Sequence, residues 1–285
     1  MAIVVDGLIA GTQLALLAVG MTLVFGLAGV LNLAYGQMVV IVAVIINLLI
    51  GAGVGVPIAC AIGLVAGGVI GWGVDATVLR PLRGTTGESR VVLGLLVTLA
   101  IAFIIDGLVV WTVPYTALSV AVGWMPVDLI GVRLRAGSLV AFVVAVIALA
   151  ATWILLATTS WGRQIRAVSA DEQGAQLTGI DPAAVRRVVM VASGLIAAVV
   201  AIARGLSSSV GAADGFDLTV MALIVAVVGG LGRVGGAWAA GLALGVVHAA
   251  MTAWIGTAMT TVVMLTVAAV AILVRRGGLV GRPST

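Results

Sequence analysis

Apolar runs, most of them long enough to cross a membrane, follow one another along almost the whole chain. Hydrophobic residues occupy 63% of the 285 positions and charged residues only 8%, whereas a soluble domain is typically about one quarter charged. A helix needs about 20 apolar residues to cross the hydrocarbon layer. We therefore expect an all-α fold, a polytopic membrane helix bundle of about eight or nine transmembrane segments, with residues 1–285 in a single membrane domain.

Nine runs are candidates for these segments, and two of them, the second and the seventh, are too short to cross a membrane comfortably. Short or glycine-interrupted segments at membrane depth are typical of transporters, in which broken or re-entrant helices line a cavity. The sequence therefore predicts that some helices are broken. The nine runs are 8–30, 38–50, 56–79, 91–113, 138–158, 182–205, 218–231, 237–255 and 259–274.

One long polar passage, residues 161–187, interrupts the apolar pattern and is called the island below. Its flanks favour a cytoplasmic loop near residues 159–181. A solvated connection is the simpler interpretation, but long loops in compact domains are uncommon unless they serve a function. We therefore favour a docking element for another protein. The charged residues of the island are Arg163, Arg166, Asp171, Glu172, Asp181, Arg186 and Arg187.

The island also carries signals for helix ends. Ser169 and Glu172 have the S-x-x-E spacing of a capping box, which starts a helix. Gly179 is suited to end that helix, and Asp181 followed by Pro182 has the pattern of an N-cap and the first residue of the next span. The sequence thus predicts one short helix held by a turn at each end.

Basic residues indicate which side of the membrane each loop occupies. All fourteen are arginine, and loops kept in the cytoplasm carry an excess of basic residues. With nine spans, the island and the C-terminus lie in the cytoplasm and the N-terminus lies outside; if the short second run is re-entrant, the N-terminus moves inside. The arginines outside the island that mark the cytoplasmic side are Arg80, Arg83, Arg90, Arg275, Arg276 and Arg282.

Missing residue types exclude several functions. Without any lysine the chain has no P-loop of the form G-x-x-x-x-G-K-[ST], so if ATP drives the protein, another chain hydrolyses it. The arginines flank apolar runs and form no clustered basic face, which argues against nucleic-acid binding. One histidine and one cysteine cannot populate a catalytic or metal-ligand cluster. We expect no catalytic residue, no metal and no cofactor.

The stretch LNLAYGQ places polar groups between the first two apolar runs. Asn32, Tyr35, Gly36 and Gln37 are either a polar loop at the surface or a pathway-lining element. Polar groups inside a bundle are costly unless they pair or face water. The shortness of the run that follows favours an unwound element that lines a pathway.

Three isolated ionisable residues lie nearest to the interiors of the predicted spans. Asp106 and Arg204 fall toward the outer ends of their spans, where a side chain can extend to water at little cost. His248 has no partner nearby in the sequence. We predict structural roles for Asp106 and Arg204 and keep His248 as a candidate for the pathway.

A glycine-rich stretch, GGLGRVGG, joins the seventh and eighth runs. Its G-x-G-x-x-G spacing matches the dinucleotide fingerprint, which works only between a soluble strand and a helix. Because both flanks here are membrane-apolar, we predict a tight inner turn instead. The glycines of this turn are Gly229, Gly230, Gly232, Gly235 and Gly236.

Five stretches of the chain together resemble the permease subunits of branched-chain amino-acid ABC importers, binding-protein-dependent systems of the prokaryotic cell membrane. The resemblance covers nearly the whole chain, and its most specific parts are the island and the glycine-rich turn. In chain order the stretches are LNLAYGQM, RPLR, GRQIRAVSADEQGAQLTGID, AVVGGLGRVGGAWAAGLALGVV and GLVGRP.

The resemblance implies a permease that pairs with a second, similar permease subunit, two cytoplasmic ATP-binding subunits and an extracytoplasmic solute-binding protein delivering leucine, isoleucine or valine. It assigns the translocation pathway to Asn32, Gly36 and Gln37. The cytoplasmic helix would dock into a groove of the ATPase, a role that falls on Arg163, Arg166, Asp171, Glu172 and Gly179.

Two departures from the family pattern concern the solute. The family usually has a stretch like N-F-A-H-G-E, where this chain carries Leu33, Tyr35 and Gln37, and His248 replaces a residue that is often acidic. Permeases of urea or short-amide importers are closely similar, so such an importer is the first alternative. A stand-alone secondary carrier is the second alternative, and a membrane-embedded enzyme is the third.

Overall fold

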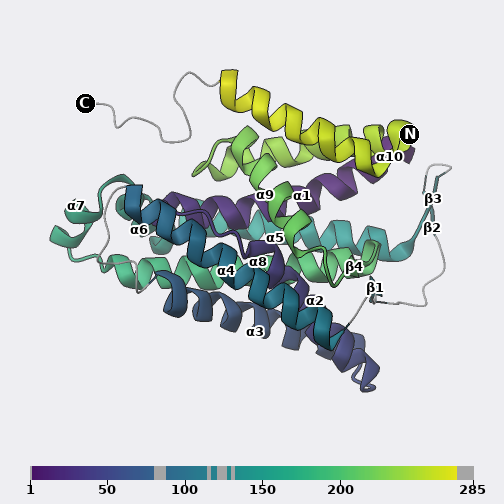
Figure 1. Cartoon of the computed structure of the whole chain (residues 1–285), viewed down its shortest axis with the longest axis horizontal. Helices are drawn as coiled ribbons and strands as arrows, with labels where there is room; N and C mark the ends of the chain where they lie inside the picture. The colour runs from purple at the N-terminus through teal and green to yellow at the C-terminus, as the bar shows by residue number, and fades with distance from the viewer. Residues whose placement is uncertain (1, 80–87, 114–116, 121–126, 130–131, 275–285) are drawn as a thin grey trace.

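The structure is a computed structural model that describes residues 2–79, 88–113, 117–120, 127–129 and 132–274, and it is an elongated bundle of helices (Figure 1). Arg80, Arg83 and the three C-terminal arginines used for the topology lie outside the described residues. In order, the helices are α1 (Ala2–Ala28), α2 (Tyr35–Gly51), α3 (Val56–Val74), the π-helical extension η1 (Asp75–Leu79), α4 (Glu88–Thr112), α5 (Ala136–Thr158), α6 (Ser160–Ala170), α7 (Glu172–Leu177), α8 (Pro182–Ser207), α9 (Gly215–Gly229) and α10 (Val234–Val274).

The prediction of a polytopic helix bundle with broken helices is confirmed. Within the described residues, six helices are long and apolar enough to cross a membrane, and the two short apolar helices are α2 and α9. The ninth run is the second part of α10, which is interrupted at Gly256, where the backbone is non-helical with φ 80° and ψ 168°. Figure 1 shows this second part folding back along the bundle. All nine predicted runs thus correspond to helical segments.

Four short strands lie between the helices in the part of the chain that the structure describes. β1 (Ala117–Leu118) pairs antiparallel with β4 (Val210–Gly211), and β2 (Val127–Leu129) pairs antiparallel with β3 (Val132–Leu134). These strands lie at the end of the bundle opposite to α6 and α7 (Figure 1). The two ends of the bundle are therefore distinct: one carries the strands and the N-terminus, and the other carries the island.

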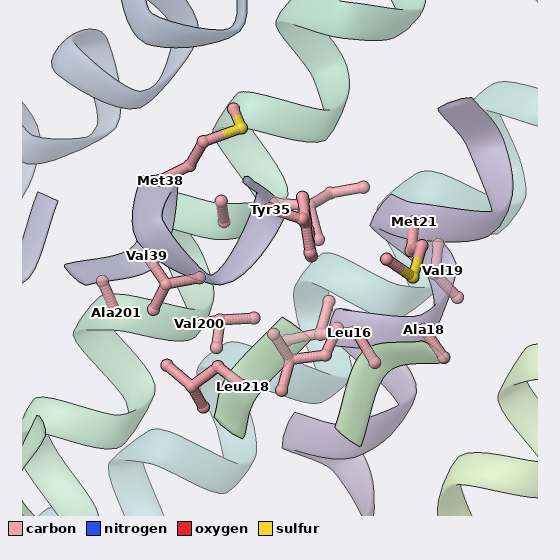
Figure 2. Close-up of a cluster of buried hydrophobic side chains, with 14 of the residues drawn as sticks. Leu16, Ala18, Val19, Met21, Tyr35, Met38, Val39, Val200, Ala201 and Leu218 are labelled. Carbon is pink, nitrogen blue, oxygen red and sulfur yellow. The ribbon is translucent and has the colours of Figure 1, made fainter. Parts of the chain in front are cut away.

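Small residues allow the central helices to pack closely. A Cβ atom added at Gly245 of α10 would meet the backbone of Gly11 in α1, and one added at Gly194 of α8 would meet the backbone of Gly67 in α3. These glycines therefore lie at helix contacts, as expected for a bundle held by close backbone approach. Larger side chains fill the space between α1, α2, α8 and α9, where Leu16, Met21, Tyr35, Met38, Val200 and Leu218 are buried together (Figure 2).

Apolar side chains also cover the outer surface. Phe103, Trp111, Ile147 and Trp254 are more than half exposed. An outer surface of this kind is expected of helices that face lipid. The chain is accordingly a multi-pass membrane protein.

Candidate functional site

The connection between α1 and α2 is an unwound segment inside the bundle. α1 ends at Ala28, the next six residues are non-helical, and α2 begins at Tyr35. Asn32 organises the start of α2, because its Oδ1 accepts a hydrogen bond from the N–H of Ala34 at 3.1 Å and its carbonyl accepts one from Tyr35. Tyr35 and the two residues after it form the first turn of α2.

Two threonines from distant helices bind the free backbone groups of this segment. Thr98 of α4 accepts from the N–H of Leu33 at 3.2 Å. Thr219 of α9 accepts from the N–H of Gly36 at 2.9 Å. Its Oγ1 lies 3.2 Å from the carbonyl of Leu33 and 3.0 Å from that of Gly215, which share its one proton. Backbone groups at membrane depth have no water to bind, so the protein must supply their partners. The sequence reading missed both threonines, whose only signal is a hydroxyl inside an apolar run.

α2 and α9 begin at the same place and touch through their first turns. A Cβ atom at Gly36 would meet the carbonyl of Gly215, and one at Gly215 would lie 3.0 Å from Cγ of Gln37. Two interrupted helices that start in contact inside a membrane bundle resemble the discontinuous helices around which transporters form their binding sites. We call the contact among Asn32–Gln37, Thr98, Asp106 and Gly215–Thr219 the junction.

Gln37 links the junction to Asp106 of α4. Its Nε2 donates to Asp106 Oδ2 at 3.3 Å, and Thr219 Oγ1 lies 3.5 Å from its Oε1. The other carboxylate oxygen of Asp106 is buried and has no hydrogen-bond partner among the described residues. Asp106 is partly buried and turns this carboxylate toward the junction. The sequence did not reveal the glutamine partner.

The junction is closed in this conformation. Tyr35 and Gln37 are fully buried and Asn32 is nearly so. A Cβ atom at Gly20 of α1 would collide with the Tyr35 hydroxyl, which shows how tightly the first turn of α2 is enclosed. Passage of a solute here requires the helices to separate.

His248 is not part of the junction. It lies on α10, and among the described residues it makes no hydrogen bond to the segment Asn32–Gln37. Its electrostatic neighbour is Arg204 at the end of α8, which in turn interacts with Asp214. Arg204 Nε is buried without a hydrogen-bond partner in the described part of the chain.

The island contains two helices where one was predicted. α6 begins after Thr159, whose Oγ1 accepts from the N–H of Gly162 at 3.3 Å, and it runs to Ala170. The prediction of a capping box at Ser169 and Glu172 was wrong, because Ser169 lies within α6. Asp171 caps α7 instead, with Oδ1 accepting from the N–H of Gln173 at 3.0 Å. The S-x-x-E pattern gave no means of seeing that a second helix runs through the serine.

The other end of α7 has the predicted form. Gly179 follows the last residues of α7 with φ 82°, a backbone conformation that side chains disfavour. The N–H of Ile180 then returns to the carbonyl of Ala175 at 3.1 Å. Asp181 caps α8 by accepting from Ala183 at 2.9 Å, with Pro182 at the first helical position. Side-chain caps thus stabilise the starts of α7 and α8, and the turn at Gly179 connects the two helices.

An ion pair fixes α7 to α8. Arg186 Nη1 lies 2.8 Å from Glu172 Oε1, with side-chain exposures of 7% and 37%. Asp171 and Glu172 therefore hold the island in shape. Arg166 donates to the carbonyl of Leu156 at 2.6 Å, and Arg163 contacts the carbonyl of Thr158 at 3.5 Å.

Leu177, at the end of α7, is 90% exposed, more than any other large hydrophobic residue that the structure describes. The sequence reading named only charged residues and a glycine here. Leu177 carried no separate signal, because leucine is common throughout the chain.

The glycine-rich stretch lies between α9 and α10. Gly229 ends α9, Gly230 and Gly232 have positive φ, and α10 begins at Val234. A Cβ atom at Gly236 would collide with the carbonyl of Gly229, and one at Gly235 would lie 3.3 Å from the ring of Trp153. Gly26 of α1 packs against the same turn, which therefore lies beside the end of α5.

Interrupted helices that meet inside a membrane bundle, together with a capped polar island at one end, define a membrane transport permease. The chain belongs to the family described as branched-chain amino acid transport system / permease component, whose model matches residues 3–273. This is a family of ABC transporter permease subunits, which are not themselves enzymes and which work with ATPase and substrate-binding partners.

Relatives of known name agree with this assignment. The high-affinity branched-chain amino acid permease protein LivH of Salmonella typhimurium is 26% identical, over 98% of this chain and 94% of its own. BraD of Pseudomonas aeruginosa, a permease of the same description, is 27% identical over 98% of this chain and 95% of its own. The autoinducer 2 import permease LsrC of Escherichia coli is 28% identical over 88% of this chain and 69% of its own.

A solved structure has a similar fold. PsaBC from Streptococcus pneumoniae, in complex with a Fab, aligns with a TM-score of 0.52 at 14% identity, over 95% of this chain and 91% of that one. At this identity the likeness concerns the fold alone.

Proposed function

We propose that this protein is the membrane-spanning subunit of an ATP-driven importer for leucine, isoleucine and valine. The family assignment and the branched-chain amino acid permeases LivH and BraD among the relatives support this class of solute. The observation that carries the proposal is the island, whose two capped helices project from one end of the bundle and present Leu177 to the surroundings. A carrier driven by an ion gradient has no use for such an element.

The island transmits work from separate ATPase subunits. Leu177 enters a groove of the ATPase, and the charged residues Arg163 and Arg166 border the contact. Because Glu172 is bound to Arg186, a movement of α7 is passed to α8, whose far end lies beside the strands at the other face. Closure of the two ATPases thus tilts a helix that runs the length of the bundle.

The solute crosses at the junction. Tilting of α8 separates the first turns of α2 and α9, so that Asn32, Gly36 and Gln37 line a transient path. The closed junction seen here is one of the two states between which such an importer alternates. A ligand shifts an equilibrium only through its differential affinity for the two states. The path therefore binds the solute weakly and leaves selection to the solute-binding protein.

The complex contains a second permease subunit, two cytoplasmic ATP-binding subunits and an extracytoplasmic binding protein in the cell membrane of a prokaryote. In this proposal the island and the C-terminus face the cytoplasm, a placement that the arginine distribution supports. The strand-bearing end then faces the binding protein.

Reconstitution of this chain in proteoliposomes, with and without its partners, tests the function. We expect uptake of radiolabelled leucine only when ATP, both ATPases and the binding protein are present. Uptake of urea or a short amide in place of leucine would favour the alternative importer. Leucine flux through this chain alone would show a stand-alone carrier and overturn the proposal.

A further inference from the structure

A groove on the side of the bundle lies between α5 and α8, apart from the junction. The start of α6 forms one end of it, and Leu23 of α1 and Leu64 of α3 also line it. Its volume is about 400 Å³, within the range of small-molecule sites. Leu155, Trp161 and Leu195 line the groove and are exposed. The groove therefore opens on the apolar outer surface, which faces lipid.

The wall of the groove favours an apolar occupant. None of the described residues that line it is charged, and its two hydroxyl groups belong to Thr152 and Thr159. Thr152 donates to the carbonyl of Ala148 at 2.8 Å, and Thr159 donates to the carbonyl of Leu155. Because these hydroxyls already have partners, a polar solute would lose its water and gain little in return. A hydrocarbon chain loses nothing of this kind and gains the burial of its own surface.

Two arginines of α6 lie at the island end of the groove. Arg166 donates to the carbonyl of Leu156, whose side chain lines the groove. Arg163 contacts the carbonyl of Thr158. Both guanidinium groups thus lie on the side of α6 that faces the end of α5. Neither forms an ion pair with another described residue, so each has donors left for an anion.

Trp161 indicates where the lipid headgroups lie. It lines the groove, is partly exposed and precedes Arg163 by two positions. Tryptophan is enriched at the level of the headgroups. An apolar groove that opens to lipid and ends at free guanidinium groups at this level is complementary to a phospholipid with a negative headgroup. A zwitterionic phospholipid fills the groove equally but gains less, because its headgroup also carries a positive charge.

We propose that this groove binds one anionic phospholipid from the leaflet on the island's side of the membrane. An acyl chain lies between α5 and α8, and the phosphate binds Arg163 and Arg166. The bound lipid contacts α5, α6 and α8 together and so holds the base of the island against the bundle. Neither a solute nor an ATPase takes part, so the inference goes beyond the proposed function and is tested separately from it.

Binding is measured by native mass spectrometry of the full chain in detergent, titrated with phosphatidylglycerol or with phosphatidylcholine of the same acyl chains. We expect one phosphatidylglycerol to bind about tenfold or more tightly than phosphatidylcholine. Arg163→Gln and Arg166→Gln should each weaken phosphatidylglycerol binding about fivefold and leave phosphatidylcholine binding nearly unchanged. Arg187→Gln is the matched control, because Arg187 is exposed at the same end of the bundle and does not line the groove.

Equal affinities for the two lipids overturn the inference. Equal losses from Arg166→Gln and Arg187→Gln overturn it as well, because net charge alone would then attract the lipid. Inorganic phosphate at the concentration of the lipid should displace almost none of it, since free phosphate has no chain to place in the groove. Displacement by phosphate at that concentration would show a site for the anion alone and contradict the inference.

Ala192→Phe tests the groove itself. Ala192 lines it on α8, so the larger ring should occupy the space and weaken the binding of both lipids. Unchanged affinity in this variant overturns the inference.

Overpacking can also destabilise a bundle, so a second measurement uses the wild type. Phosphatidylglycerol with a photoreactive acyl chain is crosslinked to the full chain, and the labelled peptides are identified. We expect label on the groove-lining parts of α5 and α8, at residues 148–156 and 188–199. Absence of label from these peptides overturns the inference, whether the lipid binds elsewhere or a second copy of the chain covers the groove.

Discussion

Arg186 of α8 binds Glu172 of α7 at 2.8 Å, although 14 positions separate them in the chain. The guanidinium is almost completely buried, whereas the carboxylate is about one third exposed. The ion pair joins α7 to α8. The cap at Asp171 and the turn at Gly179 stabilise the same part of the island. We therefore expect a force applied to α7 to be passed on to α8.

Removing one partner of this ion pair should weaken the coupling between ATP hydrolysis and import. Arg186→Gln and Glu172→Gln each break the ion pair, which costs about 1–3 kcal/mol when the remaining charge is partly buried. We expect faster hydrogen exchange at the amides of α7 and fewer leucine molecules imported per ATP hydrolysed. The double variant should be little worse than either single variant, because the two changes remove one interaction. If the losses of the two single variants add up in the double variant, Arg186 and Glu172 act separately.

Leu177 should be the main contact with the ATPase. Leu177→Glu places a charge where the partner offers a groove, and loss of a central apolar contact typically costs 2 kcal/mol or more, a factor of about 30 in affinity. We expect the ATPases to be lost on purification while the melting temperature of the isolated permease stays unchanged. Gln176→Glu, at the neighbouring exposed position, is the matched control for charge. Retention of the ATPases by Leu177→Glu would contradict the docking role.

Thr219 should stabilise the unwound segment between α1 and α2. Thr219→Val has nearly the same shape but leaves the N–H of Gly36 and the carbonyl of Leu33 without this partner. Each buried unpaired group costs about 1–3 kcal/mol, so a clear fall in melting temperature is expected. Thr266→Val serves as the control, since Thr266 is exposed and, among the described residues, its hydroxyl binds the carbonyl of Val262 in its own helix. An equal effect of both changes would argue against a special role for Thr219.

Gly36 should tolerate no side chain. In Gly36→Ala the new methyl group meets the carbonyl of Gly215 and the hydroxyl of Thr219, so α2 and α9 must move apart. Overpacking of this kind costs about 1–3 kcal/mol. Gly73→Ala is the matched change in α3, where a Cβ atom meets nothing within 4 Å and alanine favours the helix. Thermal unfolding of both variants should show a loss for Gly36→Ala only; two equal shifts would contradict the close packing.

The helices could be predicted well from the sequence, because a membrane imposes a length of about 20 apolar residues on each span. Even the interruption of α10 was visible, since the runs 237–255 and 259–274 meet next to Gly256. Helix ends with a fixed local geometry could also be predicted. Asp181 and Pro182 start α8, and Gly179 follows α7.

The junction could not be predicted in the same way, because its partners come from different helices. Gln37 meets Asp106 across 69 positions, and Gly36 meets Thr219 across 183. Nothing near Asp106 in the sequence indicates that it points inward. The S-x-x-E pattern at Ser169 failed for a related reason, since whether a serine caps a helix depends on where the preceding helix ends.

The central claim is that the island of this chain receives work from separate ATPases to import a branched-chain amino acid. The most direct measurement is the initial rate of leucine uptake by the reconstituted complex, compared between the wild type and Leu177→Glu at equal amounts of inserted permease. The account predicts ATP-dependent uptake by the wild type and at least a tenfold lower rate for the variant. Uptake that persists without the ATPases, or that Leu177→Glu leaves unchanged, would contradict it.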